Sequence, residues 1–128
     1  MNKNIFISID GNNTGSILQK YILSNELEKL SEFSSNLIMT IQYITQFIEK
    51  EKGKIYLTGG DNILAYIPST NLDNIIDIVK NIELKDFTFS IGIGNSSTDA
   101  YLALKYAKVS KSQSVIKYYK NRFMEYKN

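Results

Sequence analysis

The sequence predicts an α+β fold, an antiparallel β-sheet with helices mainly on one of its faces. Short β-branched runs alternate with longer stretches whose apolar residues recur every three or four positions. Two of the short runs also flank a Gly-Gly-Asp turn, a pattern typical of an antiparallel hairpin. The predicted order is β-α-α-β-β-α-β-α-β, which is a ferredoxin-like arrangement extended by a helix and a strand.

The first half of the chain predicts a buried strand, a loop and two helices. Residues 4–9, with the sequence NIFISI, predict the strand, which we expect to end at Asp10-Gly11. The loop DGNNTG then offers candidate N-caps for a short helix over about 15–22. Ser24 is expected to cap a long helix that Gly53 ends, because one helical face collects the apolar residues Leu27, Leu30, Phe33, Leu37, Ile41, Ile44 and Ile48.

The second half predicts a hairpin followed by alternating helices and strands. Strands are expected at 54–58 and 63–68, with Pro68 closing the second. Helical spacing and β-branched runs then predict, in order, a helix over 71–82, a strand over 87–94, a helix over 98–110 and a strand over 114–119.

Length and composition favour one domain, 1–128, with a basic C-terminal tail over 119–128 that frays or forms a short helix. The chain has 128 residues, of which 43% are apolar, so it can bury a hydrophobic core without the help of disulfides or a structural metal. No run is long enough to span a membrane, and NIFISI begins with no signal-peptide pattern before it. We therefore expect a cytoplasmic protein.

Histidine and cysteine are both absent. Histidine general bases, thiolate nucleophiles and most zinc sites are thereby excluded. Any chemistry falls to carboxylates, hydroxyls, lysines and backbone groups, which suit hard cations such as Mg²⁺ or Mn²⁺. Residues 1–104 hold 8 Lys and 12 Asp or Glu, a net charge of −4, whereas 105–128 hold 6 Lys, one Arg and one Glu, a net charge of +6. This asymmetry suggests either an anion site or a solvated basic tail.

Two acidic residues fall where the topology brings them together. Asp10 ends the first strand and Asp61 lies at the hairpin tip, and these strands are neighbours in a ferredoxin-like sheet. Two such carboxylates can hold a divalent cation, and carbonyls near Gly11 could complete its oxygen shell. The loop over 11–15 leads into a helix N-terminus, which suits a phosphate. Because Gly59 and Gly60 carry no side chains, a bulky ligand can lie against the hairpin.

Each of these features also has an ordinary structural interpretation, since Asp and Gly are common turn residues. Their joint placement favours a site instead. Phosphoryl and nucleotidyl transfer depend on charge neutralisation and positioning more than on a nucleophilic side chain. That requirement matches a chain without histidine or cysteine.

Four segments together resemble the palm superfamily of GGDEF cyclases and CRISPR polymerases. They are ISIDGNNTG, LTGGDNILAYIP, FTFSIGIG and AYLALKYAK. In its small size the chain most resembles the minimal CRISPR polymerases. These are stand-alone palm domains of bacterial anti-phage systems that make cyclic nucleotides. The resemblance implies a metal-dependent nucleotidyltransferase that makes a cyclic di- or oligonucleotide.

The resemblance also implies roles for individual residues. Asp10 and Asp61 correspond to the metal carboxylates, which are also the catalytic pair, and the Gly11 carbonyl to a further metal ligand. Lys108 corresponds to a helix lysine on the triphosphate, and Lys111 lies near a second basic position. The remaining nucleotide-binding positions are Gly59 and Gly60 on the hairpin, Asn62 beside them, and the phosphate loop Asn12, Asn13, Thr14 and Gly15.

Substrate and partners follow from the same resemblance. GGDEF cyclases read guanine with an Asn and an Asp, whose positions fall here on Leu18 and near Leu27, so ATP is favoured over GTP. Making a cyclic dinucleotide needs two facing sites, which implies a homodimer across the site face. The product is expected to act on a separate membrane effector, and no binding to a nucleic-acid polymer or a membrane is expected.

Two alternatives remain open. Asn12 and Asn62 stand where acidic residues are common in these families, and each keeps an oxygen but removes a charge. They motivate a catalytically weakened palm module that signals by binding a nucleotide. The second alternative is an interaction protein whose ferredoxin-like fold has no ligand.

Overall fold

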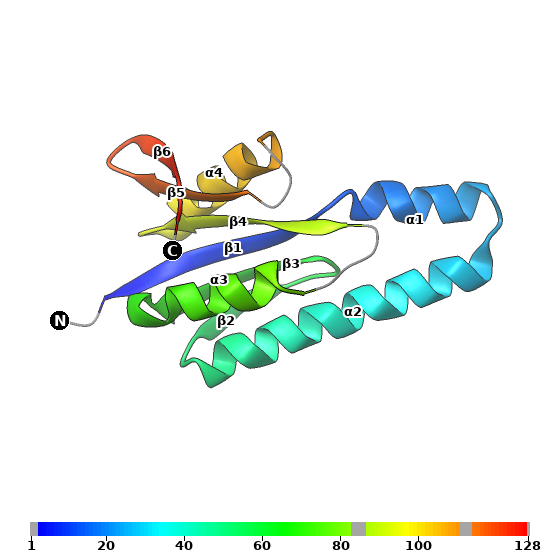
Figure 1. Cartoon of the computed structure of the whole chain (residues 1–128), viewed down its shortest axis with the longest axis horizontal. Helices are drawn as coiled ribbons and strands as arrows, with labels where there is room; N and C mark the ends of the chain where they lie inside the picture. Colours follow the sequence, from blue (N-terminus) through cyan, green and yellow to red (C-terminus); the bar gives the residue numbers. More distant parts are fainter. Residues whose placement is uncertain (1–2, 83–86, 111–113, 128) are drawn as a thin grey trace.

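A computed structural model describes residues 3–82, 87–110 and 114–127 and confirms the α+β class. Figure 1 shows the helices α1 (Thr14–Leu23), α2 (Leu27–Lys50), α3 (Leu72–Lys80) and α4 (Ser97–Lys108), and the 3₁₀ turn Ser69–Asn71 precedes α3. The strands are β1 (Asn4–Asn12), β2 (Lys54–Thr58), β3 (Asn62–Pro68), β4 (Thr88–Gly94), β5 (Val115–Tyr119) and β6 (Arg122–Glu125).

Within the described residues the strands form one sheet in the order β2-β3-β1-β4-β5-β6. Neighbouring strands are antiparallel except β4 and β5, which are parallel. The sheet is therefore mixed rather than wholly antiparallel as the sequence suggested. The reason is that α4 connects β4 to β5, and a helical crossover returns the chain in the same direction.

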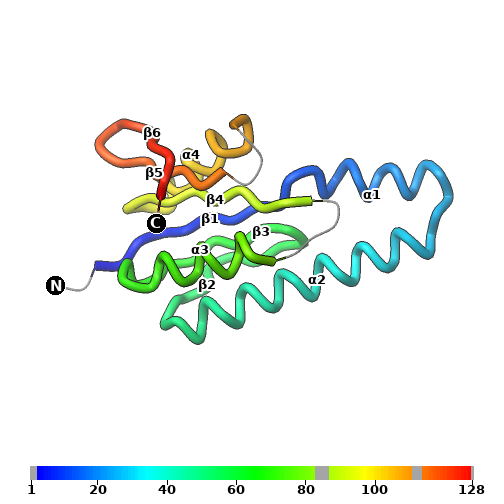
Figure 2. Tube along the Cα trace, viewed as in Figure 1, coloured from blue at the N-terminus to red at the C-terminus, as the bar shows by residue number. Residues whose placement is uncertain are grey.

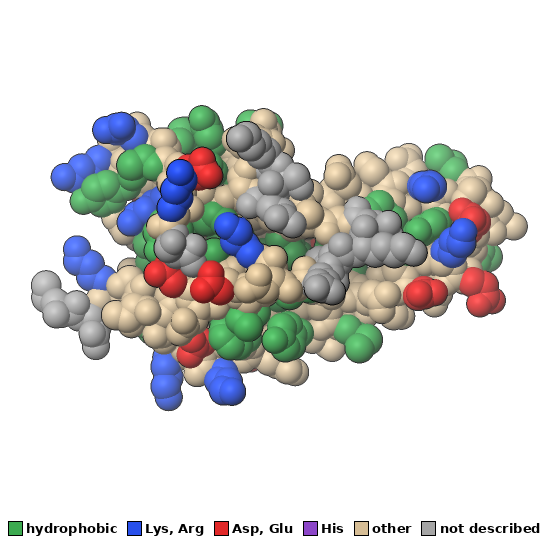
Figure 3. Space-filling view, viewed as in Figure 1, with side chains coloured by type: hydrophobic (Ala, Val, Ile, Leu, Met, Phe, Trp, Pro, Cys, Tyr) green, Lys and Arg blue, Asp and Glu red, His purple; other side chains and the backbone are tan. Residues whose placement is uncertain are grey.

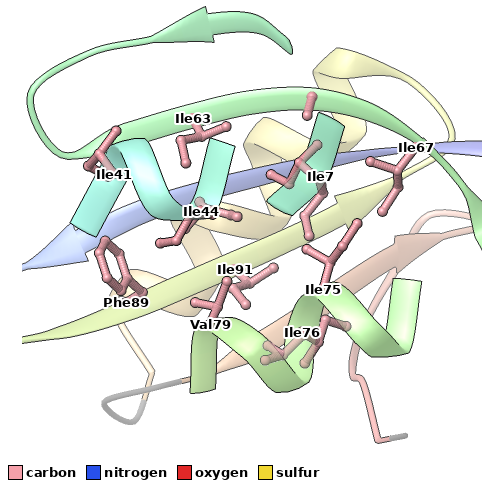
Figure 4. Packing of buried hydrophobic residues seen from close by; sticks show 14 of the residues in the cluster. Ile7, Ile41, Ile44, Ile63, Ile67, Ile75, Ile76, Val79, Phe89 and Ile91 are labelled. Carbon is pink, nitrogen blue, oxygen red and sulfur yellow. The ribbon is translucent and has the colours of Figure 1, made fainter. Parts of the chain in front are cut away.

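One face of the sheet carries the main apolar core. Because side chains alternate along a strand, the odd-numbered residues of β1 and β4 point to the same face. Figure 4 shows these residues meeting two helices, α2 through Ile41 and Ile44 and α3 through Ile75, Ile76 and Val79. The predicted helical stripe is thus core from Phe33 onward, whereas Leu27 is 59% exposed because α1 and the start of α2 project beyond the sheet (Figure 1).

The opposite face is covered by α4 over β4 and β5. A second, smaller cluster joins the buried residues Ala103, Ala107 and Ile116 there. Gly92 permits this contact, because a Cβ at that position would collide with the Ala100 carbonyl and the Leu104 amide. Helices therefore cover both faces, α2 and α3 on one and α4 on the other.

Three boundaries differ from the sequence predictions. β1 continues through Asp10 and Gly11 to Asn12, because this segment keeps pairing with β4 as far as Thr88. Ser24 is the C-terminal cap of α1 rather than an N-cap, and Glu26 precedes α2. Residues 122–125 form β6 instead of fraying or forming a helix, since Lys120 and Asn121 adopt positive φ angles of 50° and 63° that close a tight hairpin.

The chain end folds back onto the body of the protein. The Tyr126 amide donates to the Val115 carbonyl at 2.8 Å, and the Tyr126 hydroxyl donates to Asp73 Oδ1 at 2.6 Å. Figure 2 follows this path, with the red end of the tube returning across the sheet. Burial and the neighbouring Asp73 carboxylate raise the pKa of Tyr126 to about 12. The basic tail is thus partly ordered, and Figure 3 shows Lys and Arg side chains gathered around the β5–β6 hairpin.

Among the described helices, α2 is the longest. Over residues 3–82, 87–110 and 114–127, none is both long and apolar enough to cross a membrane.

Candidate active site

The strand pairing brings the two predicted carboxylates to the same edge of the sheet. Asp10 lies opposite Asn62 of β3 and opposite Ser90 of β4. The Gly11 amide donates a hydrogen bond of 2.9 Å to the Asp61 carbonyl, so the tip of the β2–β3 hairpin is tied to the end of β1. The register therefore fixes Asp61 beside Asp10 and Gly11.

Thr14 positions the second carboxylate. Its hydroxyl donates to Asp61 Oδ2 at 2.5 Å, and the residue is only 5% exposed. A Cβ at Gly11 would lie 2.8 Å from Thr14 Cγ2, so glycine lets the first turn of α1 approach the strand. From the sequence, Thr14 was predicted only as part of the phosphate loop. Its side-chain bond to Asp61 was not predicted, and the available signal was a hydroxyl beside a predicted helix start.

Lys108, the last residue of α4, reaches the same edge. Its ammonium donates to Asp10 Oδ2 at 3.0 Å and to the Gly11 carbonyl at 2.9 Å. The side chains are 32% exposed for Lys108 and 22% for Asp10. The resemblance placed this lysine on a triphosphate, but in this structure it contacts two of the three proposed metal ligands.

The pKa of Asp10 is raised above its usual value. Burial is the largest cause, because it disfavours the charged carboxylate. The hydrogen bond from Lys108 opposes this shift, while the negative charge of Asp61 adds to it. Two carboxylates thus share a partly buried edge, where a positive charge is favourable.

The two asparagines at positions where the resemblance led us to expect acidic residues have different surroundings. Asn12 Nδ2 donates to Thr88 Oγ1 at 3.0 Å, and Ser90 Oγ donates to Asn12 Oδ1 at 3.0 Å. Asn62 Oδ1 is buried and has no hydrogen-bond partner among the described residues. It lies against Gly59, where a Cβ would collide with it, so glycine at 59 accommodates the asparagine.

The remaining predicted residues lie around this edge. Asn13 is the N-cap of α1 with a φ of 67°, in the left-handed region that asparagine tolerates. Gly15 and Gly60 border open space, since a Cβ at either would meet no atom within 4 Å. Lys111 lies outside the described residues.

The donor set is compatible with a hard divalent cation. Asp10, Asp61 and the Gly11 carbonyl supply only oxygen ligands, which Mg²⁺ and Mn²⁺ prefer. The described part of the chain contains no group of three or more Asp, Glu, His or Cys side chains that could enclose a metal. The observed set therefore fits an open site, in which phosphate oxygens or water complete the shell, as is usual for Mg²⁺.

Comparison with solved structures supports the fold assignment. One similar chain is a diguanylate cyclase/phosphodiesterase from Caldicellulosiruptor saccharolyticus, with a TM-score of 0.66 and 18% sequence identity. The match covers 95% of this chain and 80% of the other, and at this identity it speaks for the fold alone. No curated protein sequence is similar enough to count as a match.

The fold and the family-model match together define a palm domain of the polymerase and nucleotidyl-cyclase type. More specifically, residues 6–118 match the minimal CRISPR polymerase domain. The chain belongs to that family, and the family prediction made from the sequence is confirmed.

Proposed function

We propose that this protein is a metal-dependent nucleotidyltransferase that makes a cyclic di- or oligonucleotide from ATP. The observation that carries the proposal is the meeting of Asp10, Asp61 and Lys108 at one sheet edge, next to the start of α1. This edge combines oxygen ligands, a cation and a helix N-terminus. Nucleotidyl transfer requires this combination to hold phosphates and neutralise their charge.

The residues have distinct tasks in this proposal. Asp10, Asp61 and the Gly11 carbonyl would hold Mg²⁺ or Mn²⁺, which would supply charge neutralisation at the reacting phosphate and would lower the pKa of the attacking hydroxyl. Thr14 orients the Asp61 carboxylate through its 2.5 Å hydrogen bond. The first-turn amides of α1, beginning at Thr14, have no intrahelical acceptor and face the phosphates. Lys108 binds the leaving pyrophosphate.

ATP is the proposed substrate because the guanine-reading positions carry apolar side chains. Leu18 of α1 packs against the core, and Leu27 starts α2 with its side chain exposed. Neither can hydrogen-bond a base edge. Competition between ATP and GTP in one reaction tests this point, and we expect the product to contain adenine.

A homodimer across the site face completes the proposal. Each site holds one nucleotide, so the hydroxyl of one must attack the α-phosphate of the other. The same sheet face carries an aromatic group made of Phe6, Tyr56 and Tyr66. The ring centroid of Phe6 lies 6.3 Å from that of Tyr56 and 4.5 Å from that of Tyr66. Tyr56 is 56% exposed, which is compatible with a second copy packing there.

The family match supports a proposal about the biological setting. We propose that the protein acts in the cytoplasm in bacterial anti-phage defence and that its product is read by a separate membrane effector. Direct binding to a nucleic-acid polymer or to a membrane is not part of the proposal.

The direct test is to incubate the protein with ATP, GTP, CTP or UTP and either Mg²⁺ or Mn²⁺. Pyrophosphate release is measured, and products are identified by mass spectrometry. We expect release with ATP and loss of release in Asp10→Asn and Asp61→Asn. Absence of pyrophosphate release with every nucleotide and both metals would refute the proposed enzymatic activity.

A second candidate is a nucleotide-binding module with weakened catalysis. Asn12 favours it, because an amide carries no charge to offer a second cation and this amide is already bonded to Ser90 through its oxygen and to Thr88 through its nitrogen. Binding of an ATP analogue without turnover would favour this candidate. Asn62→Asp is then expected to raise the turnover rate.

A further inference from the structure

The ammonium of Lys108 contacts the same oxygens that the proposed metal site uses. It lies 3.0 Å from Asp10 Oδ2 and 2.9 Å from the Gly11 carbonyl oxygen. These distances are typical of charge-assisted hydrogen bonds. In this conformation the lysine is committed to the metal ligands, so it is not available to a phosphate.

The contact has an electrostatic reason. Asp10 is 22% exposed and lies near Asp61, so the edge concentrates negative charge away from bulk water. Leaving a partly buried carboxylate unpaired is costly, and a nearby cation reduces that cost. In the protein without a metal, the Lys108 ammonium is the cation at this position.

A divalent cation and this ammonium compete for the site. Mg²⁺ binds oxygen ligands at roughly 2.0–2.1 Å. If it took Asp10 and Gly11, it would stand within a few ångströms of the ammonium, and the two positive charges would repel each other strongly. Lys108 is well placed to leave, because it ends α4 and its flexible side chain is 32% exposed.

We propose that Lys108 is an internal counter-ion that occupies the cation position whenever no divalent cation is bound and moves to the nucleotide phosphates when one binds. The inference rests on the proposed function and deepens it. It makes metal and nucleotide binding mutually dependent, because the phosphates give the displaced ammonium a new partner. The protein alone therefore binds a divalent cation weakly, and the nucleotide strengthens that binding.

The test is a Mn²⁺ titration without nucleotide, in which the electron paramagnetic resonance signal measures the concentration of free Mn²⁺. Lys108→Met is compared with the wild type and with Lys105→Met. Lys105 is a matched control on the same helix, exposed, with its ammonium 5.1 Å from the Tyr101 ring centroid. We expect Lys108→Met to bind Mn²⁺ roughly 5- to 150-fold more tightly than the wild type, the usual range of such couplings, and Lys105→Met to match the wild type.

A second titration adds a non-hydrolysable ATP analogue. The analogue is expected to tighten Mn²⁺ binding more in the wild type than in Lys108→Met, because only the wild type has an ammonium to relocate. Adding Asp10→Asn to the Lys108→Met variant is expected to abolish the tight binding, which assigns the ion to this edge. Lys108→Gln serves in the same comparison if the methionine variant does not fold.

Equal Mn²⁺ affinities in the wild type and Lys108→Met would overturn the counter-ion inference and leave the proposed activity standing. Absence of Mn²⁺ binding in the lysine variants would also overturn it. Failure of the proposed function would be seen in a different measurement: the wild type would release no pyrophosphate at saturating metal.

Discussion

The geometry of the proposed metal site depends on one small group, the hydroxyl of Thr14. It is buried and donates to Asp61 Oδ2, so it fixes one of the two carboxylates without being a metal ligand itself. Residues that orient ligands in this way typically contribute 10- to 100-fold to metal affinity or activity, on the order of a direct contact.

Thr14→Val is therefore expected to lower the rate of pyrophosphate release by roughly 10- to 100-fold. Valine has nearly the same shape but cannot donate, so Asp61 loses its partner while the packing under Gly11 stays. Thr14→Ser keeps the hydroxyl and is expected to stay close to the wild-type rate. If valine and serine reduced the rate equally, the hydrogen bond would not be the reason.

Asp10 illustrates a conflict between stability and function at the residue scale. Its pKa is raised in the folded protein, chiefly by burial, so ionisation of this carboxylate opposes folding. For an acid whose pKa is raised on folding, the folded state is favoured at pH values below the usual 3.8 and loses that advantage as the pH rises through the raised value.

Asp10→Asn is accordingly expected to raise the melting temperature at neutral pH while abolishing pyrophosphate release. The gain in melting temperature should shrink as the pH falls below the raised pKa of Asp10, where the wild-type carboxyl is neutral as well. Thermal unfolding across this pH range measures the effect. Glu49→Gln, at an exposed position of α2, is the control and should show no comparable gain.

At the scale of elements, α4 depends on the absence of a side chain in β4. A Cβ at Gly92 would meet backbone atoms of Ala100 and Leu104, which cannot rotate away. This close packing sets how near α4 lies to the sheet, and Lys108 at the end of α4 contacts Asp10 from there.

Gly92→Ala is expected to reduce the free energy of unfolding by about 1–3 kcal/mol or more, the usual cost of overpacking. Denaturant unfolding measures this loss. Gly60→Ala is the matched control, because its Cβ would meet no atom within 4 Å, and its unfolding should resemble the wild type. Equal losses in both variants would contradict the packing argument.

The β5–β6 hairpin and its following tyrosine form a second structural dependency. Tyr126→Phe removes the hydrogen bond to Asp73 and is expected to cost about 1 kcal/mol of unfolding free energy near neutral pH. The raised pKa of Tyr126, about 12, favours the folded state fully below the usual value of 10, and this contribution is lost as the pH rises from 10 towards 12. The difference between wild type and variant should narrow over that interval in equilibrium unfolding.

The elements show what sequence reasoning captured and what it missed. The apolar stripe from Phe33 to Ile48 identified α2, because burial of one helical face makes apolar residues recur in the sequence with a period of about 3.6 residues. The hairpin before β6 escaped prediction, since its left-handed turn uses Lys120 and Asn121 rather than the usual Asn-Gly. Asp10 and Asp61 could be placed together from topology alone. The contacts of Thr14 and Lys108 could not, because they depend on side-chain reach across elements far apart in sequence.

At the scale of the whole molecule, the sheet has two faces with different roles. One face is sealed by α2 and α3 and holds the core, as Figure 4 shows. The other is covered by α4 on β4 and β5, and it carries the proposed site and the Phe6 aromatic group on the neighbouring strands. In the proposed homodimer, two copies of this second face meet, so each cyclic product depends on two intact sites.

Mixing subunits tests that dependence. Wild-type protein is combined with Asp61→Asn protein in increasing proportion at constant total concentration, and cyclic product is measured by mass spectrometry. If each ring needs both sites of a dimer, formation of the cyclic dinucleotide should follow the square of the wild-type fraction, so that equal mixing leaves about one quarter of the activity. Mixed dimers retain one intact site, which is expected to form one of the two phosphodiester bonds, so a linear dinucleotide should accumulate. A linear dependence on the wild-type fraction, with no linear product, would instead indicate that one chain closes the ring alone.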